Sequence, residues 1–391
     1  MRQQVHEDML IIWLEGAIDS SNAKSVEQAI LDALEETGCR RVRLDADKLS
    51  YISSAGLRVI VRLLKLCDEV TLVNASSDVY DVLDMTGMRE IMDVRKRLRE
   101  ERLDGLRQIG AGAFGRVYRL DAERVMKVYQ PSVNPLEKIE RERLAARQAF
   151  IHDIPSAIPF DTVRVGEEYG IIYELIDAQT LGEAVMAEPE RLEEYATRMA
   201  QLLKKLHTTH FSDRQLPDAR GIFQGWVDVA ERSGLYADET IGKLRRFVDE
   251  IPAGDTFVHG DYHPANIMVM SDGELLLIDM GDASMGDPII DLAGTYHVLR
   301  VAAKRPGGAE RFTGMPEDVL EQVWGVFVRT YYGVSDAAEV EAIEHHLAFM
   351  ALPRGMGSTA RSKLLTEAAR VQQARQLEET FLAGYHKYAA L

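Results

Sequence analysis

The sequence predicts a multidomain chain of α/β and α+β class, with a small α/β domain followed by a sheet-rich lobe and a large helical lobe. Three observations lead to this prediction. The chain has 391 residues, which is enough for two or three hydrophobic cores. Short β-like and amphipathic segments alternate over the first 95 residues. After a charged run, glycine-punctuated strands are followed by segments that mostly show helical periodicity.

Composition and charge narrow the class of protein. With 46% hydrophobic and 28% charged residues, the chain is typical of globular proteins. A formal net charge of −17 argues against general affinity for nucleic acid, which needs a clustered basic surface. No apolar run is long enough to cross a bilayer, and the start MRQQVHEDML lacks a secretory signal. The two cysteines, Cys39 and Cys67, suit a reducing compartment. We therefore expect a cytoplasmic protein without a nucleic-acid or membrane partner.

Residues 1–95 form the predicted α/β domain. The expected strands are residues 9–14, 41–44 and 70–73. Apolar residues at helical spacing predict one helix between the first two strands, ending at Gly38, and another between the second and third. Either Ser53 or Ser54 caps the second helix, because serine side chains accept hydrogen bonds from free N–H groups at helix starts.

Residues 96–102 form a predicted charged linker. The run RKRLREER, residues 95–102, mixes arginine with glutamate and has Leu98 as its only apolar residue. This pattern predicts a solvent-exposed linker helix rather than a binding patch.

Residues 103–177 form the predicted sheet-rich lobe, and residues 178–391 form the helical lobe. In the sheet-rich lobe we expect a hairpin over 107–120, the strand VMKVY, a charged helix over 134–150 and two strands within 163–176. The helical lobe contains one expected strand pair, around Ile267 and Leu276.

A glycine-rich stretch, GAGAFGRV, opens the sheet-rich lobe. Gly110, Gly112, Gly115 and Val117 fit the pattern G-x-G-x-x-G-x-V, in which glycines let backbone amides approach the phosphates of a nucleotide. Glycines also occur in hairpin turns for steric reasons alone, so this motif leaves both interpretations open.

Lys127, in VMKVY, lies on the strand that follows this loop. An ammonium at that place can reach the α and β phosphates of a nucleotide. The charged helix that follows carries Glu140 and Glu142, and one of these can pair with Lys127. We favour Glu142.

The stretch HGDYHPANIM contains Asp261 and, five residues later, Asn266; Asp279 follows after thirteen more. The same offsets separate the catalytic aspartate and the two metal ligands of kinase-type phosphotransferases. The chemistry needs a carboxylate to accept or orient the proton of the attacking hydroxyl. It also needs amide and carboxylate oxygens to hold Mg²⁺.

The residues of this stretch allow two other interpretations. It can be a simple turn whose histidines bond to the backbone, or a zinc site of His259, Asp261 and His263, although that set has no fourth ligand. The glycine loop and Lys127, in the order that phosphotransfer requires, favour the catalytic interpretation.

Residues 103–391 resemble the aminoglycoside phosphotransferase and choline kinase branch of the protein-kinase-like fold, whose loop reads H-G-D-x-H-x-x-N. The resemblance implies a bilobal protein-kinase-like domain that uses ATP and Mg²⁺. It implies that Asp261 is catalytic, that Asn266 and Asp279 bind Mg²⁺, and that Lys127 contacts the ATP phosphates.

The same resemblance implies further roles around the loop. Backbone groups of Glu174 and Ile176 would contact adenine, His259 would pack near Asp279, and Asp291 would brace the helical lobe. In protein kinases an arginine precedes the catalytic aspartate, whereas Gly260 stands here. We therefore expect the loop to lack a guanidinium and not to be activated through a phosphorylated segment.

The stretch LDADKLSYISSAGLRVI, residues 44–60, resembles the STAS domain of sulfate transporters and anti-sigma factor antagonists. The serine that is phosphorylated in that family falls on Ser54, at a helix start where free amides favour phosphate. Ser53 and Ala55 depart from the usual aspartate and serine, which favours a plain capping role.

The sequence thus predicts a STAS-like domain joined to an ATP- and magnesium-dependent phosphotransferase that acts on the hydroxyl of a small molecule. One alternative is a regulatory protein that binds a partner through the STAS-like domain and senses nucleotide. Another is a kinase that phosphorylates a protein serine such as Ser54. A cationic acceptor would be attracted by acidic residues of the helical lobe, namely Glu183, Glu188, Glu190, Asp228 and Glu231.

Overall fold

The computed structural model describes residues 2–6, 8–112, 115–130, 136–211 and 216–388. The chain divides into two compact units, Met1–Glu101 and Arg102–Leu391. Each unit has its own hydrophobic core. Among the residues just given, no helix combines the length and the apolar character needed to span a membrane.

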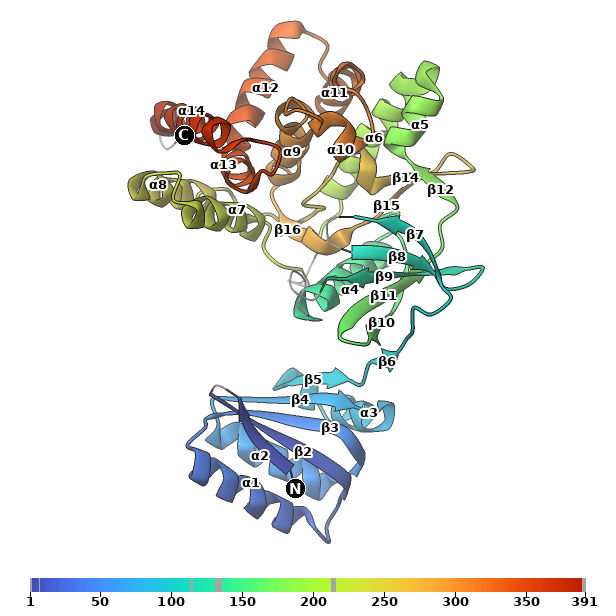
Figure 1. Ribbon diagram of the computed structural model, residues 1–391, viewed down its shortest axis with the longest axis vertical. Helices are drawn as coiled ribbons and strands as arrows, with labels where there is room; N and C mark the ends of the chain where they lie inside the picture. Colours follow the sequence, from blue (N-terminus) through green and yellow to red (C-terminus); the bar gives the residue numbers. More distant parts are fainter. Residues whose placement is uncertain (1, 7, 113–114, 131–135, 212–215, 389–391) are drawn as a thin grey trace. The chain divides into compact units, whose positions relative to one another are not determined.

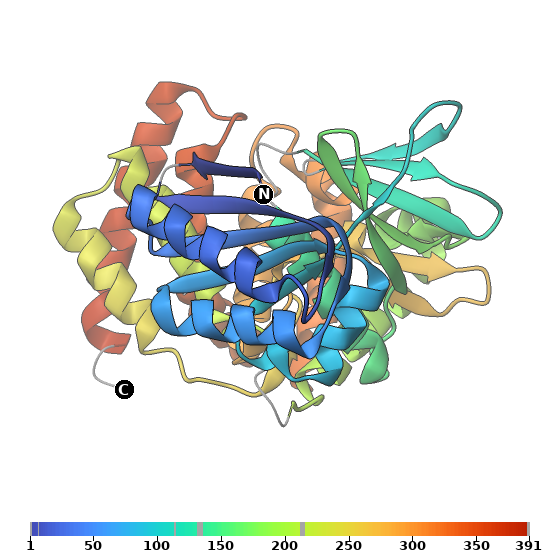
Figure 2. The same cartoon turned by 90° about the horizontal axis from the view of Figure 1, so that it is seen from below.

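The first unit is a five-stranded sheet in the order β1-β2-β3-β4-β5, in which β1 is antiparallel to β2 and the other neighbours are parallel. Its strands are β1 (Arg2–His6), β2 (Met9–Ile18), β3 (Arg41–Ile52), β4 (Glu69–Ala75) and β5 (Asp93–Lys96). Successive parallel strands are connected by α1 (Ala23–Thr37), α2 (Ser54–Leu66) and α3 (Ser77–Met85). Figures 1 and 2 show α1 and α2 side by side against the sheet. The three predicted strands and two predicted helices are confirmed, and β1, β5 and α3 complete the unit.

The ends of the two predicted helices follow their sequence signals. Helix α1 is followed by Gly38 at φ 67°, a left-handed conformation that favours glycine. Helix α2 has Ser53 as its N-cap, because Ser53 Oγ accepts a hydrogen bond from the Ala55 N–H at 3.2 Å. Ser54 is therefore the first residue of the helix and not its cap.

The predicted linker helix over residues 95–102 is wrong. This part of the chain is extended, with β5 ending at Lys96 and the two-residue strand β6 at Arg99–Glu100. A run with a single apolar residue has no apolar face that could hold a helix against a core. The first residues of the run belong instead to β5, which pairs with β4.

The sheet-rich lobe of the second unit has antiparallel neighbours in the order β10-β11-β9-β8-β7. Its strands are β7 (Arg107–Ala111), β8 (Gly115–Arg119), β9 (Arg124–Tyr129), β10 (Pro159–Val165) and β11 (Glu168–Glu174). Helix α4 (Leu136–Ile151) packs against β10 and β11. The predicted hairpin and strands are confirmed. The expected start of the charged helix at Asn134 lies outside the described residues.

The large lobe is mainly helical (Figure 1). Its helices are α5 (Leu181–Ala187), α6 (Leu192–His207), α7 (Arg220–Ser233), α8 (Asp238–Asp249), α9 (Ile289–Tyr296), α10 (Gly308–Thr313), α11 (Glu317–Tyr332), α12 (Ala337–Met350), α13 (Leu352–Arg361) and α14 (Glu367–Tyr388). Short strands support the loops between them: β12 (Ala178–Thr180), β13 (Thr256–Val258), β14 (Ile267–Met270), β15 (Leu275–Leu277) and β16 (Ser284–Gly286). The sheet β12-β14-β15 contains the predicted strand pair.

Candidate active site

The hairpin of β14 and β15 brings Asn266 and Asp279 together. Its register pairs Ile267 with Leu277, and the Ile278 N–H donates to the Asn266 carbonyl at 3.0 Å. Asn266 immediately precedes β14, and Asp279 is one residue beyond this hydrogen bond. The thirteen-residue offset seen in the sequence therefore corresponds to two hairpin arms of matching length.

Buried Asp291 on α9 holds the loop that follows β13. Its two carboxylate oxygens accept hydrogen bonds from the N–H groups of His259 and Gly260, each at 2.7 Å. On the other side, the His259 ring lies 3.2 Å from the Ile278 carbonyl, next to Asp279. Both side chains therefore hold loop backbone in place.

Asp261 lies between two basic side chains. Its Oδ1 accepts a hydrogen bond from Arg354 at 2.5 Å, and its Oδ2 lies 3.4 Å from His263 Nε2. Burial would raise the pKa of Asp261, but the charges of His263 and Arg354 outweigh it and hold the pKa far below its ordinary value. The side chain is therefore a carboxylate, the form that can accept a hydrogen bond from a hydroxyl.

Asn266 and Asp279 offer oxygen atoms of the kind that Mg²⁺ prefers. The Asn266 amide nitrogen donates to the Asp261 carbonyl at 2.9 Å, which leaves the amide oxygen for a ligand. Asp279 contacts Lys127 through Oδ1, at 2.9 Å, and its Oδ2 makes no hydrogen bond to any other described residue. Amide and carboxylate oxygens are hard donors, so the residues present fit Mg²⁺.

The zinc alternative is wrong. No three histidine, cysteine, aspartate or glutamate side chains of the described chain gather as ligands for one metal ion. His259 faces the Ile278 carbonyl, whereas His263 faces Asp261.

Lys127, on β9, forms ion pairs with one carboxylate of each lobe. Its ammonium lies 2.8 Å from Glu142 Oε1 and 2.9 Å from Asp279 Oδ1. The hydroxyls of Tyr129 and Tyr173 also donate to Glu142 Oε1, at 2.7 and 3.2 Å. Desolvation would lower the pKa of Lys127, but Glu142 and then Asp279 raise it above its ordinary value, so the side chain remains an ammonium.

Glu140, the other candidate for this pair, is two positions before Glu142, about half a turn round α4. It forms an ion pair with Arg143 at 3.0 Å. Glu142 is buried and is the glutamate that contacts Lys127.

The three glycines of the predicted phosphate loop have different surroundings. A Cβ at Gly115 would lie 2.3 Å from the Val128 carbonyl oxygen, so packing alone requires glycine there. A Cβ at Gly110 would make ordinary contact with Val117, at 3.6 Å. A Cβ at Gly112 would meet nothing within 4 Å, so close packing gives no reason for this glycine. Ala113 and Phe114, in the same motif, lie outside the described residues.

The stretch expected to contact adenine connects the two lobes, after β11 and before β12. The Glu174 N–H donates to the Ile158 carbonyl at 3.1 Å and is not free for a ligand. The Ile176 N–H donates to no other described residue. Of the backbone N–H groups of these two residues, that of Ile176 is therefore the one available.

In the first unit, Ser54 is exposed at the start of α2. Because Ser53 forms the cap, the Ser54 hydroxyl has no hydrogen bond to any other described residue. This hydroxyl is therefore exposed to solvent in the first unit.

Most of the acidic residues proposed to attract a cationic acceptor have local partners. Glu183 closes a capping box with Thr180 at the start of α5. Glu188 pairs with Arg191, and both Asp228 and Glu231 pair with Arg245 on α8. These charges therefore already have partners within the same helix or on a neighbouring element.

Two side chains of the site were missed by sequence reasoning. Asp282, at the end of the turn after Asp279, lies close to Gly260, and desolvation followed by the charge of Asp261 raises its pKa. Arg354 lies 93 residues beyond Asp261, so no local spacing could reveal it. The loop itself has no arginine at position 260, as expected, and the guanidinium beside Asp261 comes from α13.

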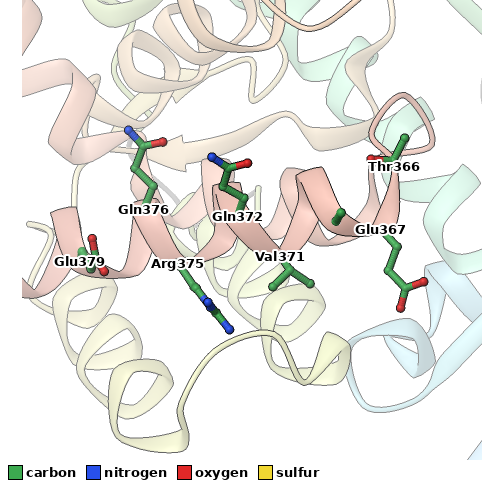
Figure 3. Close-up of a pocket in the computed structure, with 8 residues that line it drawn as sticks. Thr366, Glu367, Val371, Gln372, Arg375, Gln376 and Glu379 are labelled. Atoms are coloured by element: carbon green, nitrogen blue, oxygen red, sulfur yellow. The ribbon is translucent and has the colours of Figure 1, made fainter.

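A wide concavity of about 1120 Å³ lies along α14 and is separate from these residues. Figure 3 shows Gln372, Arg375 and Gln376 among its lining side chains, all on one helix. Because α14 and the adjoining Thr366 supply the whole lining, the concavity is an open surface and not an enclosed site.

Comparison with protein families agrees with this geometry. Residues 105–321 match the model of the phosphotransferase enzyme family, and residues 1–101 match that of the STAS domain. The first match covers more than half of the chain. The chain therefore belongs to the phosphotransferase enzyme family, as a kinase-type enzyme with an N-terminal STAS domain.

Individual relatives match the two parts separately. The candidate anti-sigma factor antagonist BtrV of Bordetella bronchiseptica is 39% identical over 92 residues, covering 22% of this chain and 78% of the relative. The ADP-bound structure of aminoglycoside phosphotransferase APH(2'')-Ib is 15% identical, with a TM-score of 0.48 over 78% of this chain and 98% of that one. A candidate anti-sigma factor antagonist from Thermotoga maritima is 22% identical, with a TM-score of 0.23 over 24% of this chain and 85% of that one.

Proposed function

We propose that this chain transfers the γ-phosphate of ATP, in the presence of Mg²⁺, to the hydroxyl of a small molecule. The observation that carries the proposal is the convergence of four side chains contributed by different elements. Lys127 pairs with Asp279, the β14–β15 hairpin places Asn266 beside Asp279, and Asn266 bonds to the backbone of Asp261. These are the side-chain types that phosphoryl transfer requires, because the reaction depends on positioning and electrostatics.

In this function the sheet-rich lobe holds the nucleotide. The Lys127 ammonium, oriented by Glu142, would contact the α and β phosphates. Gly110, Gly112, Gly115 and Val117 would let the β7–β8 turn approach the phosphates, with the open surroundings of Gly112 as the structural support. The Glu174 carbonyl and the Ile176 N–H would contact adenine.

Asn266 and Asp279 would hold Mg²⁺, whose charge offsets that of the phosphates. The Asp261 carboxylate would orient the acceptor hydroxyl. The hydroxyl oxygen bonds to the γ-phosphorus, and the bond from phosphorus to the β-phosphate oxygen breaks. The hydroxyl proton passes to Asp261 and then to solvent, so that ADP, a phosphate ester and one proton are formed.

The acceptor is proposed as a small alcohol without a commitment to an aminoglycoside. Four of the five acidic residues considered for a cationic acceptor are in ion pairs or helix caps. They therefore give no support to a strongly cationic acceptor.

A thermal-shift screen with Mg-ATP and a panel of aminoglycosides, amino alcohols and sugars tests the acceptor class. The decisive variant is Asp261→Asn, which keeps the shape of the side chain and removes its charge. Turnover should fall about 10² to 10⁴-fold, the usual contribution of a positioned acid–base group. Normal turnover in Asp261→Asn would contradict the proposal.

The STAS domain supports a second proposal, that the chain binds a protein partner and that Ser54 is a protein acceptor. Its exposure, together with the free hydroxyl that results from capping by Ser53, favours this residue. Incubation with labelled ATP and mapping of the label tests it, with Ser54→Ala as the control. Label elsewhere, or none, dismisses Ser54 as an acceptor. A stoichiometric partner in a pull-down, without phosphate transfer to any acceptor, would favour a purely regulatory protein.

A further inference from the structure

Arg354 reaches the catalytic loop from helix α13. Its guanidinium donates to Asp261 Oδ1 at 2.5 Å and to the Gly260 carbonyl at 3.2 Å. The residue is only 8% exposed. One guanidinium therefore binds the side chain of Asp261 and the backbone immediately before it, and this two-point contact fixes direction as well as distance.

The packing around α13 leaves room for this arrangement. Helix α13 packs on α7 (Figure 1). A Cβ at Gly357 of α13 would lie 2.4 Å from the Trp226 carbonyl oxygen, so glycine permits the close approach. A Cβ at Gly294 of α9 would lie 2.9 Å from Arg354 Nη1, so a second glycine leaves space for the guanidinium. The guanidinium also lies 5.7 Å from the centre of the Trp226 ring.

The loop could not provide this group from position 260. Gly260 has φ 82°, and a Cβ there would lie 2.6 Å from the Asp282 carbonyl oxygen and 2.9 Å from Ile222 Cδ1. An arginine at that position would displace the loop. The guanidinium beside Asp261 must come from elsewhere in the fold, and α13 supplies it.

Asp261 is held unequally through its two oxygens. Oδ1 makes the short bond to Arg354, whereas Oδ2 has longer contacts among the described residues, 3.4 Å to His263 and 3.5 Å to Asn266. An acceptor hydroxyl can therefore bond to Oδ2, because it displaces only these weak contacts.

Given the phosphotransferase function proposed above, we propose that Arg354 is a positioning residue for phosphate transfer, which holds Asp261 by Oδ1 and leaves Oδ2 for the acceptor hydroxyl. It acts through Asp261 and does not contact the nucleotide. This role predicts an effect on kcat with little effect on the KM for Mg-ATP.

The test measures phosphate release from Mg-ATP with water as the acceptor, in the full chain. Arg354→Met, which keeps much of the aliphatic volume, should lower kcat about 10²-fold, the usual effect of a misplaced reacting group. Its KM for Mg-ATP should stay within about twofold of wild type, whereas its thermal midpoint should fall because Asp261 loses a buried cation. Arg361→Met is the matched control, because Arg361 is on the same helix, 5.0 Å from the same Trp226 ring, and has no contact with the loop among the interactions of the described residues. Its kcat should equal that of wild type.

A double-mutant cycle separates positioning from an independent role. If Arg354 acts through Asp261, the double variant Asp261→Asn/Arg354→Met should be no slower than Asp261→Asn alone. Additive losses overturn the inference, and so does an unchanged kcat in Arg354→Met. If Arg354→Met does not fold, Arg354→Lys serves, since an ammonium keeps the charge but not the two-point geometry. It should lower kcat by about tenfold or less with the KM for Mg-ATP unchanged, and a wild-type kcat again overturns the inference. A wild-type chain that releases and transfers no phosphate contradicts the proposed function itself, and the inference with it.

Discussion

Lys127 and Asp279, 152 residues apart in the sequence, are joined by a 2.9 Å contact between Nζ and Oδ1. One residue is on β9 of the sheet-rich lobe and the other follows β15 of the helical lobe. Glu142 shares the same ammonium, so one partly buried cation holds two carboxylates from different elements. This ion-pair group connects the proposed nucleotide site with the proposed metal site.

Replacing Lys127 with methionine should affect both stability and nucleotide binding. Glu142 would remain buried without its cation, and breaking a buried pair in this way costs about 3 to 5 kcal/mol. Loss of a charged hydrogen bond to phosphate should raise the KM for Mg-ATP about 10 to 100-fold. Thermal denaturation and steady-state kinetics measure the two effects. Lys243→Met is the control, because the partner of Lys243 among the described residues is the exposed carboxylate of Glu239. An unchanged KM in Lys127→Met would contradict the proposed role.

The two glutamates of α4 provide a matched pair of variants. Glu142→Gln removes the charge next to Lys127 and should lower kcat/KM for Mg-ATP about tenfold. Glu140→Gln removes an ion pair with Arg143 near the surface and should leave kcat/KM unchanged, since such pairs contribute little. Equal effects of the two substitutions would show that the Lys127–Glu142 contact has no functional role.

Gly260→Ala should damage the catalytic loop more than backbone strain alone can explain. Gly260 and Gly273 both have positive φ, 82° and 86°. An alanine Cβ at Gly260 meets backbone at 2.6 Å, whereas one at Gly273 meets only the end of the Arg198 side chain, at 3.4 Å. Both variants should lose about 1 to 3 kcal/mol from strain, and Gly260→Ala should lose turnover in addition. Stability and kcat of the two variants, measured side by side, decide this; equal kcat values would contradict it.

Magnesium dependence should follow Asn266. Asn266→Ala removes the amide oxygen proposed as a ligand, so the Mg²⁺ concentration for half-maximal turnover should rise about tenfold or more. The control is Asn74→Ala, because the Asn74 side chain bonds to Asp45 in the other unit. Turnover that persists after complete chelation of Mg²⁺ in the wild type would contradict the proposed cofactor.

Stability should depend on pH through His297. Desolvation, followed by the charges of Arg354 and Arg305, lowers the pKa of this buried side chain well below its ordinary value. The unfolded chain then binds a proton near pH 6.5 and the folded chain does not. The free energy of unfolding is therefore unaffected above pH 6.5 and decreases as the pH falls below it. Between pH 7.5 and 5.5 the loss is about 1.4 kcal/mol. Chemical denaturation of wild type and His297→Gln at both pH values measures it, and an identical pH dependence of the two proteins would refute it.

Local sequence pattern was sufficient to predict much of the fold and the order in which the site residues occur along the chain. The helix that ends at Gly38 and the glycine hairpin follow from periodicity and turn residues that act over a few positions. The proximity of Asn266 and Asp279 also follows from short-range information, because a hairpin of two short strands joins them. The linker helix was predicted wrongly since polar residues alone do not determine whether a segment is helical or extended.

Contacts between distant elements could not be obtained in this way. Glu140 and Glu142 are equally plausible from charge, and the orientation of α4 on the sheet places Glu142 next to Lys127. Arg354 has no motif, and its contact with Asp261 requires α13 to pack closely on α7. That packing depends on glycines that admit neighbouring atoms, such as Gly357 against Trp226. Periodicity tells which face of a helix is buried, whereas the shapes of the packed surfaces determine which residues on two distant helices meet.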